Sequence, residues 1–66
     1  MENISFRTTV LPLSDRLFRL ALRITMNRAE AEDVVQETWL RAWNVRDRVE
    51  LTDAYILRIA RNVCVN

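Results

Sequence analysis

The chain has 66 residues, half of them hydrophobic, and a formal net charge of +1. This length allows one small domain with a limited core, and the apolar content excludes a disordered tail. All ten basic residues are arginine, histidine is absent, and the single cysteine, Cys64, cannot form an internal disulfide. We therefore expect no metal site, no Cys–His nucleophile and no cofactor.

Long periodic segments with few turn residues favour an all-α fold. We expect a small three-helix bundle in which a break of the first helix near Pro12 is allowed, since proline interrupts a helix interior. No stretch approaches the roughly 20 apolar residues of a membrane span, and the N-terminus lacks the layout of a secretory signal. The expectation is a cytoplasmic protein without membrane insertion.

The first strong helical pattern runs from Leu13 to Met26. Because it is apolar over much of its circumference, it should pack on more than one side. Its expected core residues are Leu13, Leu17, Leu20, Ala21 and Ile24, widened by Phe18 and Leu22, and its expected solvated edge is Arg16, Arg19 and Arg23. Since the chain has no glycine, a turn that needs positive φ is expected to use asparagine or aspartate.

A second helix is predicted from Asn27, which forms a capping-box-like start with Glu30, to about Val45. Its residues recur at three- and four-residue spacing on two faces. The first face is apolar and is expected to enter the core: Ala31, Val35, Thr38, Trp39 and Ala42.

The second face of this helix, which we call the acidic stripe, consists of Asp33, Gln36, Glu37 and Leu40. A purely solvated face has no need of a leucine, whereas carboxylates around an apolar anchor suit an arginine-bearing partner. From periodicity alone, a docking surface and an ordinary solvated face both remain open.

A polar connector, residues 46–52, leads to a third helix that should start at Thr52 or Asp53. Its expected core stripe is Ile56, Ile59, Ala60 and Val63. Arg58, Arg61 and Asn62 on the opposite face favour nucleic-acid contact, with an ordinary polar surface as the alternative. The helical pattern reaches Asn66 without a stop signal, so we expect a fragment of a longer protein.

No catalytic constellation is present in the sequence. The acidic residues Glu30, Asp33 and Glu37 are explained by helix capping and solvation, and the chain has no glycine-rich phosphate loop. An enzymatic function is not expected.

Three ordered segments resemble region 2 of bacterial sigma factors, most closely the extracytoplasmic-function group. They are LFRLALRIT (17–25), AEDVVQET followed by WLRAW (31–43), and RIARN (58–62). The resemblance implies that residues 1–66 form one helical domain that binds the clamp helices of the RNA polymerase largest subunit. It also implies recognition and opening of the promoter −10 element, with flipped bases of the non-template strand held as single-stranded DNA. An anti-sigma factor is a further partner that the resemblance allows.

Residue by residue, the resemblance places polymerase binding and DNA binding on two sets. The polymerase-binding set is Asp33, Gln36, Glu37, Leu40 and Arg41. The DNA-binding set is Arg46, Arg48, Tyr55, Arg58, Arg61 and Asn62, with Asn62 in a flipped-base pocket, which offsets the cost of extruding a base.

The chain departs from the family pattern at two places, and two other functions stay open. Tyr55 stands where the family often has tryptophan, and Met26 or Asn27 replaces the usual glycine. The family's domain that reads the −35 element is expected to be absent. The alternatives are a protein-only helical interaction domain and a small helix-turn-helix reader of duplex DNA, for which Asp53-Ala54-Tyr55-Ile56 is a poor recognition helix.

Overall fold

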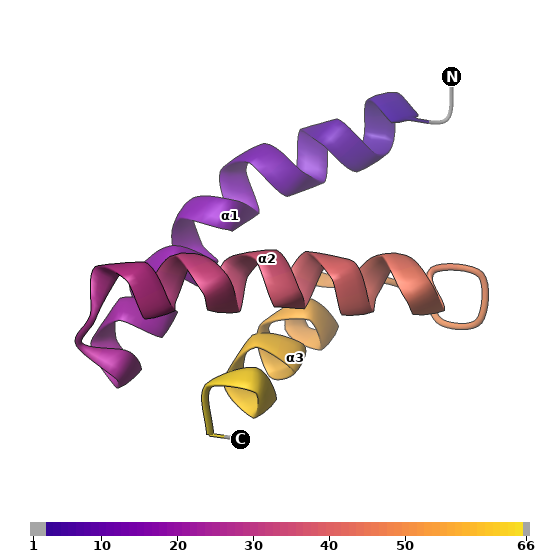
Figure 1. The fold of residues 1–66 in the computed structure, drawn as a ribbon. Coiled ribbons are helices and arrows are strands. Elements are labelled where there is room, and N and C mark those ends of the chain that lie inside the picture. The colour runs from indigo at the N-terminus through magenta and orange to yellow at the C-terminus, as the bar shows by residue number, and fades with distance from the viewer. Residues whose placement is uncertain (1–2, 66) are drawn as a thin grey trace.

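A computed structural model describes residues 3–65, with side chains from residue 12 onward. The chain forms three helices: α1 (Asn3–Thr25), α2 (Arg28–Val45) and α3 (Asp53–Val65). Each helix contacts the other two, and the N-terminal half of α1 extends beyond the bundle (Figure 1). The predicted all-α, three-helix fold is confirmed.

The allowed break near Pro12 does not occur, because α1 continues through this residue. Proline adopts a φ that is compatible with a helix and removes a single backbone donor. Pro12 is exposed, so its ring lies outside the packed core.

Among the side chains that the structure describes, residues 12–65, nine from all three helices are buried in the core, and Thr38 is the polar one of these nine. They are Leu13, Leu17, Ala21, Ala31, Val34, Thr38, Ala42, Ile56 and Ala60. The hydroxyl of Thr38 donates to the carbonyl oxygen of Val34 at 2.7 Å, which satisfies its hydrogen-bonding need without leaving the helix.

The predicted core stripes are largely correct, with two corrections. Ile24 is 42% exposed, because it lies in the last turn of α1, beyond the packed part of that helix. Val34 is buried although it was not assigned to the core stripe, since α2 packs against both α1 and α3 and therefore buries a wider arc. Other predicted core residues pack against the core while staying half-buried: Leu20, Val35, Trp39, Ile59 and Val63.

The turn between α1 and α2 places Met26 in the left-handed region, with φ 55°. The expectation that asparagine or aspartate would take such a position is wrong here. Asn27 has an extended backbone and caps α2, its side chain accepting a hydrogen bond from the Glu30 N–H at 2.9 Å. The return bond of a capping box is replaced by one from the Asn27 N–H to the Thr25 hydroxyl.

The start of α3 agrees with its predicted cap. The Tyr55 N–H donates to the Thr52 hydroxyl at 3.1 Å, which satisfies one of the amides that a helix start leaves unpaired. Between α1 and α2, the indole N–H of Trp39 donates to the Ser14 hydroxyl at 2.9 Å. These local and tertiary bonds set the positions of the helices that carry the predicted functional residues.

Candidate functional site

The acidic stripe lies on the face of α2 opposite the core. Asp33 and Gln36 are exposed, Glu37 is half-buried, and Leu40 is 60% exposed. Four apolar or polar residues one half-turn away are buried in the same helix, so the helical period itself turns the stripe outward. The four predicted docking residues therefore form one open surface with an apolar side chain at its C-terminal end.

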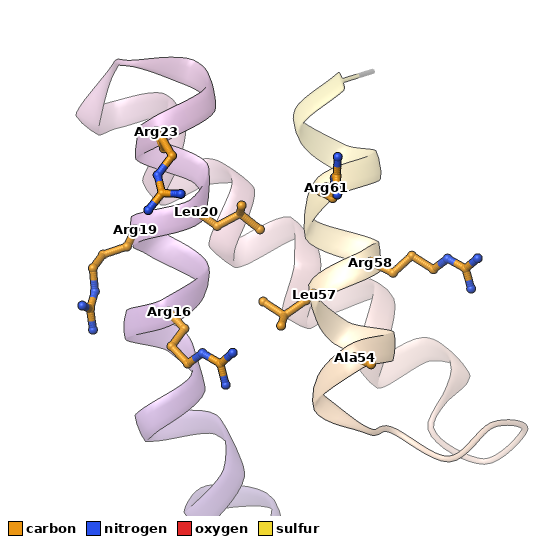
Figure 2. A pocket seen from close by; sticks show the side chains of 8 residues that line it. All are labelled: Arg16, Arg19, Leu20, Arg23, Ala54, Leu57, Arg58 and Arg61. Carbon is orange, nitrogen blue, oxygen red and sulfur yellow. The ribbon is translucent and has the colours of Figure 1, made fainter.

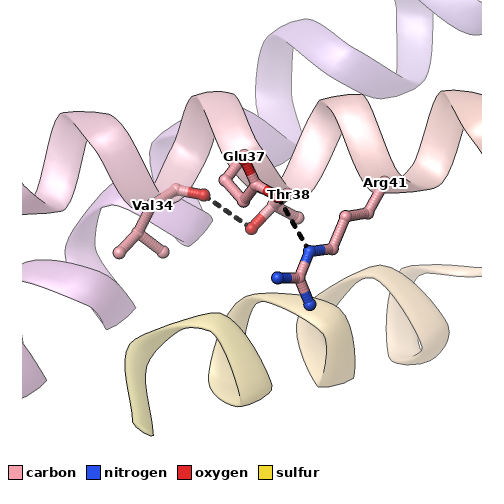
Figure 3. A network of polar contacts seen from close by, with 4 residues as sticks. All are labelled: Val34, Glu37, Thr38 and Arg41. Carbon is pink, nitrogen blue, oxygen red and sulfur yellow. Dashed lines mark hydrogen bonds and ion pairs between the residues drawn. The ribbon is translucent and has the colours of Figure 1, made fainter. Parts of the chain in front are cut away.

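Arg41, the fifth predicted polymerase-binding residue, pairs with a member of the stripe. Its Nε lies 3.0 Å from Oε2 of Glu37, at the i,i+4 spacing of facing helix residues (Figure 3). Both side chains are about half exposed, so this pair is worth a few tenths of a kcal/mol. An incoming arginine can therefore compete for the carboxylate of Glu37 at little cost.

A pocket of about 300 Å³ between α2 and α3 brings together two predicted DNA-binding residues, Tyr55 and Asn62. Asn62 is exposed and Tyr55 is half-buried. Arg41 also lines this pocket, together with Ile59, and its guanidinium lies on the α3 side of α2 (Figure 3). Arg41, which the resemblance assigns to the polymerase-binding set, thus borders the same pocket as two residues of the predicted DNA-binding set.

The connector arginines lie at the C-terminal end of α2 instead of in this pocket. Nη1 of Arg46 donates to the Trp43 carbonyl at 2.7 Å, and its guanidinium stacks 3.7 Å from the Trp43 ring centroid. Nη2 of Arg48 donates to the Asn44 carbonyl at 3.4 Å. Positive charge is favourable beside the last carbonyls of a helix, which explains why both side chains fold back on α2.

The remaining two predicted DNA-binding residues, Arg58 and Arg61, line a different cleft, which we call the arginine groove. It lies between α1 and α3, has a volume of about 570 Å³, and is also lined by Arg16, Arg19 and Arg23 (Figure 2). Sequence reasoning assigned the three α1 arginines to a solvated edge. The spacing of the three arginines places them on one face of α1. Only the packing of α1 against α3 shows that this face borders the same cleft as Arg58 and Arg61.

Other chemistries find no support in the part of the chain that is described. Residues 3–65 contain no group of three or more His, Cys, Asp or Glu side chains able to hold a metal ion, and none of their helices is long and apolar enough to cross a membrane. Burial raises the pKa of the Cys64 thiol through desolvation, so its reactive thiolate form is disfavoured.

Comparison with known proteins agrees with this architecture. The family model described as Sigma-70 region 2 matches residues 10–66. The chain is also 44% identical, over 54 residues, to proteins named ECF RNA polymerase sigma factor SigL from three strains of Mycobacterium tuberculosis. The match covers 76% of this chain and 30% of each relative, so the chain spans about a third of their length. No solved structure matches the chain significantly. The chain belongs to the sigma-70 region 2 family, as its three helical motifs predicted.

Proposed function

We propose that this chain is the module of a bacterial sigma factor that docks on core RNA polymerase and binds the opened −10 element of a promoter. Family membership supports the general role. The observation that carries the docking assignment is the acidic stripe itself, in which Leu40 is 60% exposed beside carboxylates that face away from the core.

The proposed polymerase contact is with the clamp helices of the largest subunit. Arginines on that partner would form charge-assisted hydrogen bonds with Asp33 and Glu37, and the amide of Gln36 can both donate and accept. Leu40 would lose its water on docking, which supplies the apolar part of the contact. Three of the four stripe residues are already exposed in the isolated domain: Asp33, Gln36 and Leu40.

The proposed DNA contact uses the other side of α2. The pocket between α2 and α3 presents Asn62, Tyr55 and Arg41, which supply a paired donor and acceptor, an aromatic ring and a positive charge. This combination suits a base that has left the stack, since an amide can hold its edge while a ring and a guanidinium contact its face. The Trp43–Arg46 stack at the end of α2 extends the surface with a second aromatic group.

The two alternative functions have less support. A duplex reader needs base-reading side chains at the start of α3, but Asp53 lies there and pairs with Arg16, and a carboxylate repels phosphates. A protein-only interaction domain has no use for an exposed asparagine beside arginine and tyrosine.

The proposed promoter-binding activity belongs in the bacterial cytoplasm, where the polymerase is. An anti-sigma factor that blocks this activity has to cover the acidic stripe or α3.

The docking assignment is tested by charge reversals of two exposed carboxylates, one within the acidic stripe and one outside it. Asp33→Arg should weaken binding to core RNA polymerase by about tenfold or more, because like charges placed across an interface cost several kcal/mol. Glu50→Arg is the control: Glu50 is also exposed and undergoes the same charge change, but it lies in the connector after α2 and outside the acidic stripe. Biolayer interferometry with immobilised polymerase measures both, and equal affinities of the two folded variants would contradict the assignment.

The DNA assignment is tested by Asn62→Ala. The affinity of the unsubstituted chain should vary about tenfold across a panel of single-stranded oligonucleotides that differ in one base. The variant should lose most of this variation, because the hydrogen bonds from Asn62 to the base edge are removed. Fluorescence anisotropy measures the spread. Polymerase binding should stay unchanged, since Asn62 lies on α3 and is exposed. An unaltered spread, or an equal loss of polymerase binding, would argue against a base-reading role.

A further inference from the structure

The pair formed by Glu37 and Arg41 connects the acidic stripe with the pocket between α2 and α3. Glu37 belongs to the stripe and does not line the pocket, whereas Arg41 lines it together with Tyr55, Ile59 and Asn62. The two side chains are one turn apart on α2, and the carboxylate is nearer the N-terminus, which is the favourable order for an i,i+4 pair. Glu37 can therefore affect the pocket through Arg41.

The contact between the two side chains uses one nitrogen of the guanidinium. Nε of Arg41 donates to Oε2 of Glu37 at 3.0 Å. The other two nitrogens, Nη1 and Nη2, form no hydrogen bond within the described residues. Figure 3 shows them on the side of the guanidinium away from Glu37, toward α3. The bond to Glu37 thus sets the direction of the guanidinium without occupying the part that faces α3.

The carboxylate of Glu37 also keeps an oxygen for a second partner. Its Oε1 forms no hydrogen bond within the described residues, and the side chain is 45% exposed. An ionised carboxylate can accept hydrogen bonds at both oxygens. The pair with Arg41 is therefore compatible with the proposed polymerase contact of Glu37.

A guanidinium that is held at its edge is suited to stack on a base. The group is planar, and its N–H donors point outward in that plane. A base that stacks on the flat face leaves these donors free, so stacking and the bond to Glu37 can exist together. Tyr55 and Asn62 lie in the same pocket, which gives one base an aromatic ring, an amide and the plane of Arg41.

We propose that Glu37 is a positioning residue for DNA: its carboxylate orients the guanidinium of Arg41 for stacking on a base in the pocket between α2 and α3. An unpaired exposed arginine samples many rotamers, and its ordering on binding costs entropy. The bond to Glu37 restricts these rotamers before DNA arrives. The inference rests on the proposed DNA-binding function and adds a role in it to a residue of the acidic stripe.

The test compares single-stranded DNA with an abasic strand of the same length, which has the same backbone but no bases. The ratio of the two affinities, measured by fluorescence anisotropy, isolates the contribution of the bases. Glu37→Ala should lower this ratio by about threefold, a factor typical of an exposed ion pair. Affinity for the abasic strand should not fall, because a negative charge near the phosphates is removed. A purely electrostatic role of Glu37 would change both affinities alike and leave the ratio unchanged.

Two substitutions with the same charge change serve as controls. Glu32→Ala removes an exposed carboxylate of α2 that forms no ion pair within the described residues, so it should leave the ratio unchanged. Glu37→Gln removes the charge but keeps an oxygen that can accept from Nε of Arg41, so it should retain more of the ratio than Glu37→Ala. Far-UV circular dichroism verifies that each variant is folded.

Arg41→Lys shows whether Glu37 acts through Arg41. Lysine keeps the charge but has no planar group, so this variant should also lower the ratio, and adding Glu37→Ala to it should have no further effect. If Glu37→Ala leaves the ratio unchanged, or lowers it equally when Arg41 is replaced, the positioning proposal is wrong while the proposed function stands. If the unsubstituted chain binds no single-stranded DNA, the proposed DNA-binding function fails and the positioning proposal with it.

Discussion

At the scale of single residues, the backbone of Met26 adopts the left-handed conformation, which is unfavourable for a residue with a Cβ. Its φ is 55°, and a residue with a Cβ in the left-handed region costs about 1–2 kcal/mol. The Met26 side chain is 83% exposed, so it recovers little of this cost by packing. Asn27 cannot relieve the strain, because its extended backbone and side chain are needed to cap α2.

We therefore expect Met26→Gly to stabilise the domain. Glycine removes the left-handed penalty but loses more entropy on folding, which leaves a net gain of about 0.5 kcal/mol in the free energy of unfolding. Urea denaturation followed by circular dichroism measures it. Met26→Ala is the control, since alanine keeps the Cβ and should show no gain. Equal effects of the two substitutions would mean that side-chain loss, and not backbone conformation, sets the stability.

Also at this scale, Glu37 and Arg41 illustrate why residue roles are hard to read in isolation. Both were assigned to polymerase binding, yet each is the other's partner at 3.0 Å, and Arg41 also borders the pocket that contains Asn62. The i,i+4 spacing alone is compatible with an internal pair, a docking pair or both. The neighbouring helix decides which groups lie beside Arg41.

At the scale of secondary-structure elements, the helix ends follow the sequence closely. Capping depends on one side chain and the two or three residues after it, so the sequence assigns Asn27 as a cap and narrows the cap of α3 to Thr52 or Asp53 without tertiary information. The structure selects Thr52. The continuity of α1 through Pro12 could not. Whether a helix tolerates an interior proline depends on whether the rest of the helix is stabilised by packing and whether water reaches the freed carbonyl.

The cap at Asn27 leads to a prediction about α2. Asn27→Ala should lower the free energy of unfolding by about 1 kcal/mol, because the Glu30 N–H loses its acceptor. For a domain of this size, that loss corresponds to a fall of roughly 4–8 °C in Tm. Thermal denaturation measured by circular dichroism reports it.

Asn44→Ala supplies the comparison for the cap variant. Asn44 is also exposed and lies in the last turn of α2, where only its backbone carbonyl is used, by Arg48. Its substitution should leave Tm nearly unchanged. A fall in Tm as large as that of Asn27→Ala would show that exposed asparagines of α2 matter for a reason other than capping.

At the scale of the whole molecule, the three helices create surfaces that no single helix has. The acidic stripe belongs to α2 alone, but the Asn62 pocket needs α2 and α3, and the arginine groove needs α1 and α3. Because α3 lies between these two clefts, its residues border both of them. The residues of the acidic stripe line neither cleft, so the proposed protein partner and the proposed DNA strand would use separate surfaces.

The sequence by itself determined the helical class, the boundaries of α2, the start of α3, most of the core and the acidic stripe. All of these follow from short-range periodicity and capping, since residues at three- and four-residue spacing share a face whatever lies opposite. The tertiary structure alone decided that Val34 is buried, that Ile24 is exposed, and that Arg41 lies beside Asn62. It also decided that three arginines of α1 border the same cleft as two arginines of α3: Arg16, Arg19, Arg23, Arg58 and Arg61. The physical reason is that these relations join residues on different helices, and helical periodicity contains no information about which face of one helix packs against which face of another.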